Sequence, residues 1–376
     1  MDQRIPAEVF SPGEFVKDEL EARGWTQADL AEILGRPARL VSEIIAGKKH
    51  LTPETAHGLG AAFAMDPQVW MNLESAYRLS RARAPGDVVG RRARLYAKAP
   101  IKELLRRGWV EPTDSIDVLE QRVMSFLEMS SLDDEPQFSA AAKRTDYSEQ
   151  ASPSQIAWLC RARQLAREMV LPTYSERALR ESLDRLRAFL TEPEEARHVP
   201  RVVAECGVRF VIVESLPGSK IDGACFWLDE ERPVIAMSMR FDRIDNFWFV
   251  LRHELEHVLR KDGRTEAIVD AELEGDNAGT GTELPTSERA ANRAATDFCV
   301  PTKQMDSFVA RKSPFFSEVD LVGFARVLGV HPGIVAGQLR RRINKWNVFG
   351  KHLVKIRFAV LPSATVDGWG EVTASV

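Results

Sequence analysis

The sequence is poor in cysteine and has no long apolar run. Its four cysteines, Cys160, Cys206, Cys225 and Cys299, lie far apart and form no Cys-x-x-Cys pair. That spacing excludes a dense disulfide framework and a cysteine zinc site, and we expect buried thiols in a reducing compartment. No stretch approaches the roughly 20 apolar residues that span a bilayer, and no apolar run follows the first residues as in a signal peptide. We therefore expect a cytoplasmic protein with no membrane partner.

An excess of positive charge is also lacking. Lysine and arginine number 51 against 55 aspartate and glutamate, which gives a net charge of −4. The whole chain is therefore not a basic nucleic-acid binder, although a DNA-binding module can belong to a mildly acidic chain. With 44% hydrophobic and 28% charged residues the composition is that of an ordinary folded protein. At 376 residues the chain exceeds one comfortable core, which predicts two or more domains.

Histidine is scarce, with seven in the chain, yet two histidines lie four residues apart. On a helix this spacing puts His253 and His257 one turn from each other, where they can hold one metal ion with Glu254 beside them. Neutral imidazoles suit zinc, and a nearby carboxylate can take a proton from water. Apolar residues at 247–251 predict a largely buried helix. The pattern predicts a zinc hydrolase with Glu254 as the base; the alternative is a core helix whose histidines only satisfy hydrogen bonds.

A catalytic zinc needs a third protein ligand, and a second helix is the usual way to deliver it. Residues 286–298 form an alanine-rich stretch, typical of a helix, that ends before Pro301. Glu288, in the first turn, is the predicted third ligand. Asn292, one turn later, is predicted to hydrogen-bond a ligand side chain and fix its orientation. The alternative for Glu288 is an acid that only offsets the helix dipole.

Several spaced elements in this half of the chain occur in a familiar order. They are Ile221-Asp222-Gly223-Ala224, Pro233-Val234-Ile235-Ala236, Asp245-Asn246-Phe247-Trp248, the two histidines, Glu288-x-x-Ala291-Asn292 and Pro301. From about residue 200 to residue 345 the chain resembles the ImmA/IrrE family of zinc metallopeptidases. The resemblance implies a zinc-dependent endopeptidase whose usual targets are helix-turn-helix repressors. It also implies Zn²⁺ on His253, His257 and Glu288, with Glu254 as the base.

Two positions depart from that family pattern. Many members have glycine where this chain has Glu256, and many have phenylalanine where it has Ala294. Neither position is expected to touch the metal, because residue 256 lies on a different face of the helix from the histidines. Glu256 is either solvated or narrows the substrate groove, and the sequence leaves both possibilities open.

The N-terminal 80 residues carry a close succession of helix-start signals. Capping or helix-starting residues precede five expected helices, at Ser11, Thr26, Pro37, Thr52 and Asp66. The second and third expected helices, residues 27–34 and 38–46, are separated by a glycine-containing turn. This pattern is that of a helix-turn-helix, whose second member enters the major groove of DNA. Trp70 and Tyr77 on the fifth helix suit a dimer seam.

Apolar residues occupy one face of the third helix, at Leu40, Val41, Ile44 and Ile45. The opposite face is left with three side chains that we expect to read base edges: Arg39, Ser42 and Glu43. Three further side chains flank the helix pair and are expected to contact phosphates and set the register: Gln27, Lys48 and Lys49.

The same segment, residues 5–80, resembles a known antitoxin family. The resemblance is carried by Trp25-Thr26-Gln27, Leu30-Ala31-Glu32, the run from Ser42 to Lys49 and Thr52-Pro53-Glu54-Thr55-Ala56. These motifs are similar to those of the HigA-type branch of the XRE helix-turn-helix family. The resemblance implies a homodimeric repressor of double-stranded operator DNA and, often, a ribonuclease toxin as partner. A helical bundle that binds only protein is the alternative.

The remaining segments complete an α+β, mostly helical fold. Residues 81–198 show helical periodicity and predict a helical linker region after the five-helix domain of residues 1–80. Residues 199–376 predict a zincin-like domain, with a small sheet from strands at 208–213, 224–228 and 234–237 before the metal-binding helix, and a last strand at 353–361. His331, in a His-Pro turn, is expected to cap a helix rather than to polarise a substrate.

These features together predict a DNA-binding transcriptional repressor, similar to an antitoxin, joined to a zinc-dependent endopeptidase. The peptidase would cleave a protein, which is a repressor, a partner or the chain itself. The alternative is a transcriptional regulator without catalysis, in which the zinc domain is a sensor or a structural module.

Overall fold

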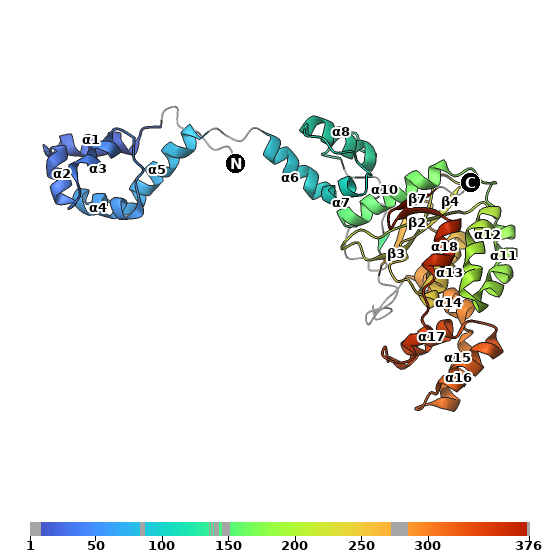
Figure 1. Cartoon of the computed structure of the whole chain (residues 1–376). Helices are drawn as coiled ribbons and strands as arrows, with labels where there is room; N and C mark the ends of the chain where they lie inside the picture. Colours follow the sequence, from blue (N-terminus) through green and yellow to red (C-terminus); the bar gives the residue numbers. More distant parts are fainter. Residues whose placement is uncertain are drawn as a thin grey trace. The chain divides into compact units, whose positions relative to one another are not determined.

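The computed structural model describes residues 9–82, 87–134, 136, 138, 143–144, 151–271 and 285–373. The chain divides into two compact units, residues 1–89 and residues 90–376 (Figure 1). Among the described residues, no single helix is both long and apolar enough to cross a membrane. Glu318–Leu328 and Pro332–Ile343 reach that length and hydropathy only when taken together, and the chain bends by 116° between them.

The first unit contains five helices over residues 9–82, as the sequence predicts. They are α1 Pro12–Arg23, α2 Gln27–Ile33, α3 Ala38–Ile45, α4 Pro53–Phe63 and α5 Pro67–Arg81. Ser11, Thr26, Thr52 and Asp66 each accept a hydrogen bond from a backbone N–H of the helix that follows, which confirms these four expected caps. Trp70, expected to suit a dimer seam, is instead fully buried in this unit's core against Phe63, so the dimer-seam interpretation is wrong for this residue.

The second unit is built around a mixed seven-stranded sheet with the order β1-β5-β3-β4-β2-β6-β7. Its strands are β1 Lys143–Arg144, β2 Arg209–Val213, β3 Ile221–Trp227, β4 Pro233–Met237, β5 Ile268–Ala271, β6 Thr365–Gly368 and β7 Glu371–Thr373. β2 runs parallel to β4 and β6, and β5 runs parallel to β1. β3 is antiparallel to both of its neighbours, β4 and β5, and β7 is antiparallel to β6.

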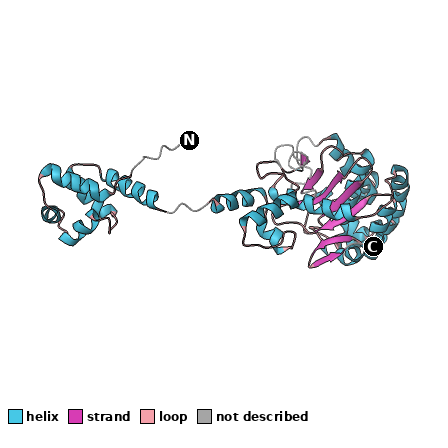
Figure 2. Cartoon of the chain, turned by 90° about the horizontal axis from the view of Figure 1, so that it is seen from above, coloured by secondary structure: helices cyan, strands magenta, loops and turns pink. Residues whose placement is uncertain are grey.

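Helices cover both faces of this sheet (Figure 2). Consecutive residues of β2, such as Phe210 and Val211, belong to different hydrophobic clusters, because successive side chains of a strand point to opposite faces of the sheet. One face packs against α6 Val88–Lys98, α7 Ile101–Arg106, α8 Ile116–Leu127 and α10 Pro153–Glu168. The region predicted as a helical linker therefore contributes to the same compact unit as the sheet.

On the opposite face, α13 carries the histidine motif and shares one hydrophobic cluster with seven other helices and with the sheet. The helices of this cluster are α11 Glu176–Ala188, α12 Val199–Glu205, α13 Ile244–Arg260, α14 Thr286–Cys299, α15 Thr302–Lys312, α16 Glu318–Leu328, α17 Pro332–Ile343 and α18 Arg357–Val360. Short 3₁₀ turns occur at Phe189–Thr191, Pro193–His198, Gly350–His352 and Leu361–Ser363. The sheet lies between two helical layers, so α13 is buried along nearly its whole length.

The predicted strand at residues 353–361 is wrong, because this segment contains the short helix α18. The carboxylate of Asp242 accepts hydrogen bonds from the backbone N–H groups of Ile356 and Arg357, at 2.8 Å each. A distant aspartate thus caps the first turn of α18 and stabilises helix over strand. The strands predicted at 208–213, 224–228 and 234–237 are confirmed as β2, β3 and β4.

Candidate metal centre and nucleic-acid interface

Helix α13 brings the two histidines of the motif together. His253 and His257 are both fully buried, and their Nε2 atoms lie 3.0 Å apart. Apolar side chains before and between them, such as Phe247, Val250 and Leu255, anchor the helix in the core. Since residues four apart share a helix face, burial of that face points both imidazoles at one spot beneath the sheet.

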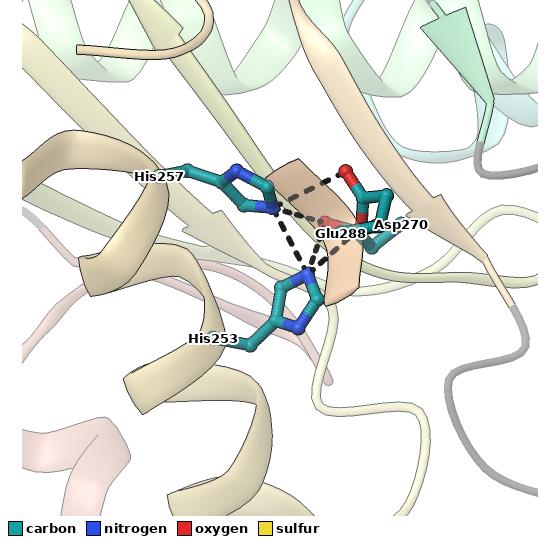
Figure 3. Close-up of side chains that lie close together, drawn as sticks. All are labelled: His253, His257, Asp270 and Glu288. Carbon is teal, nitrogen blue, oxygen red and sulfur yellow. Dashed lines mark hydrogen bonds and ion pairs between the residues drawn. The ribbon is translucent and has the colours of Figure 1, made fainter. Parts of the chain in front are cut away.

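Two carboxylates from other elements reach the same spot, so that four side chains converge (Figure 3). Glu288, in the first turn of α14, lies 3.3 Å from His253 Nε2 and 3.4 Å from His257 Nε2, through its two different oxygens. Asp270, on β5, lies 3.2 Å from His253 Nε2 and 3.8 Å from His257 Nε2. The structure therefore places Glu288 where the sequence predicts it and adds Asp270, which the sequence analysis missed.

The four donor atoms all lie within 4.8 Å of one another, and their nitrogen–nitrogen and nitrogen–oxygen separations are close to those around a small tetrahedral cation. Four ligands at 2.0–2.1 Å from a tetrahedral zinc lie about 3.3 Å from one another. The nitrogen–nitrogen and nitrogen–oxygen distances among His253, His257, Asp270 and Glu288 run from 3.0 to 3.8 Å. Two nitrogens and two oxygens also form a donor set that zinc accepts.

The charges at this centre are strongly coupled. Burial lowers the pKa of each imidazole, but carboxylates outweigh burial: Asp270 above all acts on His253, and Asp262 on His257, and each pKa rises to about 10. Burial raises the pKa of Glu288, yet hydrogen bonds from both imidazoles outweigh it and hold this pKa below its ordinary value. The centre thus attracts positive charge to a site that excludes water.

Glu254 lies beside the four donors and is itself fully buried. Neither of its carboxylate oxygens accepts an ordinary hydrogen bond from a described residue. Burial first, and then the negative charge of Asp270, raise the pKa of Glu254 well above its ordinary value. Gly223 on β3 leaves room for it, because a Cβ at residue 223 would overlap the Glu254 carboxylate and lie 2.9 Å from Val250 Cγ1.

Among the described residues, a side chain outside the four donors holds the far ring nitrogen, Nδ1, of His257 but not that of His253. Asp262 lies 3.1 Å from His257 Nδ1 and 3.4 Å from Arg260 Nε. This is the orienting role that the sequence analysis gave to Asn292. The described contacts include no hydrogen bond from the Asn292 side chain to a donor of the centre, and its backbone carbonyl accepts one from Thr296. Asp262 fits the role because a carboxylate on Nδ1 leaves Nε2 free to bind a metal.

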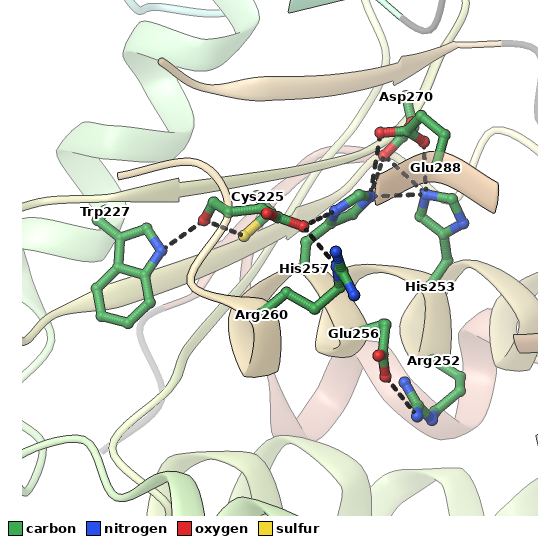
Figure 4. A network of polar contacts seen from close by, with 10 residues as sticks. Cys225, Trp227, Arg252, His253, Glu256, His257, Arg260, Asp270 and Glu288 are labelled. Carbon is green, nitrogen blue, oxygen red and sulfur yellow. Dashed lines mark hydrogen bonds and ion pairs between the residues drawn. The ribbon is translucent and has the colours of Figure 1, made fainter. Parts of the chain in front are cut away.

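Two other residues raised by the sequence have ordinary structural roles. Glu256 forms an ion pair with Arg252 on the same helix, at 2.8 Å, and points away from the histidines (Figure 4). His331 caps α17, where its Nδ1 accepts a hydrogen bond from the backbone N–H of Gly333 at 3.0 Å. The capping role predicted for His331 is confirmed.

The first unit presents the side chains predicted to meet DNA. On α3, Val41 and Ile44 are buried, whereas Arg39 and Ser42 are exposed and Glu43 is half-buried. The three expected phosphate-contacting residues, Gln27, Lys48 and Lys49, are all exposed. The division between a buried and an exposed face is therefore the predicted one.

One ion pair lies within the face that is predicted to read bases. Arg39 Nε lies 2.7 Å from Glu43 Oε1, while the Arg39 side chain keeps 86% of its surface exposed. This pair raises the pKa of Arg39 and lowers that of Glu43. Because an exposed ion pair of this kind contributes little to stability, Arg39 can exchange Glu43 for a guanine edge or a phosphate at small cost.

Comparisons with known proteins identify this first unit. The sequence model of the family described as "Helix-turn-helix" matches residues 16–70. YddM of Escherichia coli (strain K12), described as an uncharacterized HTH-type transcriptional regulator, is 30% identical over 77 residues, which are 20% of this chain and 82% of that protein. A HigA-family addiction module antidote protein from Coxiella burnetii is 32% identical over 20% of this chain and 83% of its own, with a TM-score of 0.20. Antitoxin HigA of Pseudomonas aeruginosa, solved with the higBA promoter, is 33% identical over 20% and 82%, with a TM-score of 0.19. Because most of YddM is matched at 30% identity, the chain belongs, through its N-terminal unit, to the helix-turn-helix family of transcription regulators.

Proposed function

We propose that this protein is a DNA-binding transcriptional repressor of the antitoxin type whose second unit is a zinc-dependent endopeptidase. The proposal for the second unit rests on one observation: His253, His257 and Glu288 converge within zinc-ligand distances beside the buried carboxylate of Glu254. The resemblance of residues 200–345 to ImmA/IrrE peptidases points to the same chemistry.

Charge supports a divalent cation at this centre. Glu254, Asp270 and Glu288 are all at least 96% buried, and burying three carboxylates in a small volume is costly without compensating positive charge. The carboxylates favour protons on both imidazoles, as the raised pKa values show. One divalent cation carries the same charge as those two protons, and it would replace them when bound.

His253, His257 and Glu288 would hold the zinc, which supplies Lewis acidity to a water molecule and to a peptide carbonyl. Glu254 would take the proton from the water and return it to the leaving amine. Gly223 keeps open the space that this carboxylate occupies.

The first unit would bind double-stranded operator DNA as a homodimer, with α3 in the major groove. Arg39, Ser42 and Glu43 would face base edges, and Gln27, Lys48 and Lys49 would contact phosphates. The HigA-like residues make a ribonuclease toxin a candidate partner. The protein substrate would be a repressor, a partner protein or this chain.

A second function, regulation without catalysis, is favoured by a single feature: Asp270 supplies a fourth donor, and four protein ligands are typical of structural zinc. Glu254→Gln separates the two functions. Under the proposal, this variant keeps zinc and DNA binding but loses cleavage, whereas Glu256→Gln, on the same helix, keeps all three. Zinc bound by a chain that cleaves neither itself nor a helix-turn-helix repressor, either in its natural form or with the fourth donor replaced in Asp270→Asn, would support the regulator and reject the peptidase.

A further inference from the structure

Strand β5 pairs with β3 and also carries Asp270, one of the four donors of the candidate metal centre. β3 is the strand that touches the motif helix at Glu254, through Gly223. β5 is antiparallel to β3, with Gly223 opposite Asp270, Ala224 opposite Val269 and Cys225 opposite Ile268. A segment of the chain itself thus occupies the backbone positions that strand addition would give to another peptide.

The alternation of β5 sends one side chain into the core and the next into the centre. Val269 is fully buried in the cluster that packs against α8 and α10. Asp270, its neighbour, therefore points to the α13 face, where its carboxylate lies 3.2 Å from His253 Nε2. If β5 were shifted by one residue along β3, Val269 and Asp270 would exchange faces of the sheet. The observed register is therefore what places Asp270 at the candidate metal centre.

A carboxylate in this position competes with water. Catalytic zinc keeps three protein ligands and leaves its fourth position to water or substrate. His253, His257 and Glu288 already make three, and the Asp270 distances of 3.2 and 3.8 Å place its oxygen at the fourth. An aspartate side chain has no scissile bond to offer, so it resembles a bound carboxylate product rather than a substrate.

We infer that β5 is an inhibitory strand within the chain, in which Asp270 fills the fourth position of the metal while the backbone holds the substrate-binding side of β3. This inference rests on the proposed peptidase. It also defines the substrate as an extended peptide that pairs antiparallel with Ile221–Trp227 after β5 leaves.

The anchoring of β5 is limited. Among its four residues only Val269 and Asp270 are buried, and Ile268 and Ala271 are half-buried. On its other side, within the described part of the chain, β5 pairs with the two residues of β1, Lys143 and Arg144. Over the described residues Ile268–Ala271, this is a small contact for a strand in the interior of a sheet, and under the inference a competing peptide displaces β5.

The test uses full-length Asp270→Asn and Asp270→Ala, with Asp229→Asn, in the exposed turn before β4, as the matched control. The asparagine variant has the shape of the natural residue and guards against misfolding. Zinc affinity is measured by competition with a chelator, coordination by the visible spectrum of the Co²⁺-loaded protein, and cleavage with an unfolded helix-turn-helix repressor. Loss of a residue that only hydrogen-bonds a metal ligand weakens metal binding about 10- to 100-fold, and we expect loss of Asp270, as a ligand, to weaken zinc binding at least as much. The spectrum of the Co²⁺-loaded variants should show a water ligand. Cleavage should rise about 10-fold or more.

The outcomes of this test distinguish the inhibitory role of β5 from the proposed peptidase activity. Unchanged zinc affinity and an unchanged Co²⁺ spectrum in both variants would show that Asp270 is not a ligand and would overturn the inference alone. Weaker zinc binding with no gain in cleavage would make Asp270 a structural ligand and would also overturn it. A natural chain that binds no zinc would reject the proposed peptidase itself.

Discussion

Removal of zinc should destabilise only one of the two units. Residues 90–376 contain every donor of the candidate centre, and residues 1–89 contain none of them. A ligand that binds only the folded state stabilises it by about 2.7 kcal/mol at 100 times its dissociation constant and by about 4.1 kcal/mol at 1,000 times. For a unit of about 290 residues the unfolding entropy is about 0.6 kcal/mol per kelvin, so the melting temperature should rise by about 5 to 7 °C.

The assay is calorimetry of the full chain in a zinc buffer and then in excess chelator. The transition of the second unit should shift, and that of the helix-turn-helix unit should stay in place as an internal control. His257→Ala should abolish the shift, whereas His198→Ala, at a side chain that is 44% exposed and outside the centre, should preserve it. Equal melting temperatures with zinc and with chelator would refute the argument that buried carboxylates at this centre require a cation.

Three further predictions follow from individual contacts. Gly223→Ala should keep zinc but lower kcat/KM for cleavage about 100-fold, because the new methyl group displaces Glu254; Gly323→Ala, with open space around it, should have no effect. Asp262→Ala should weaken zinc binding about 10- to 100-fold in a chelator competition, and equal weakening by Asn292→Ala would contradict the assignment of the orienting role to Asp262. In DNA binding, Arg39→Ala should relax base preference, whereas Lys48→Ala should weaken all sequences alike and reduce the salt slope by about 1; equal loss on specific and random DNA for Arg39→Ala would contradict its place at a base edge.

The sequence predicts those parts of the molecule that local patterns determine. The spacing of His253 and His257 and their apolar flanks predict a buried helix, and α13 is that helix. The caps at Ser11, Thr26, Thr52 and Asp66 similarly predict the helices of the first unit. Glu288 was also predictable, because a first-turn acid on an alanine-rich helix is a common way to complete such a site.

Long-range contacts explain what the sequence analysis missed. Asp270 belongs to a four-residue strand whose partner, β3, lies more than 40 residues earlier, so no local period identifies it. The only signal was one aspartate within the apolar run Ala267-Ile268-Val269-Asp270-Ala271. Asp262 follows the motif helix directly, and it reaches His257 only because Lys261 adopts a left-handed conformation, with φ of 61°, that turns the chain back.

Tertiary contacts also overrode two local patterns. Residues 353–361 alternate like a strand, yet Asp242, more than 100 residues earlier, caps a helical turn there. Trp70 lies on a helix with exposed positions, but packing against Phe63 buries it completely. Asp242 is distant in sequence from α18, and Phe63 meets Trp70 because the fold of the first unit packs α4 against α5.

Metal analysis of the purified chain tests the central claim most directly. The protein is prepared without chelators or affinity metals, and its zinc content is measured by mass spectrometry beside that of His253→Ala and Glu288→Ala. We predict about one zinc per natural chain and less than one-tenth of that in either variant, with DNA binding intact in all three. A natural chain without zinc, or variants that retain it in full, would contradict a metal centre formed by α13 and α14.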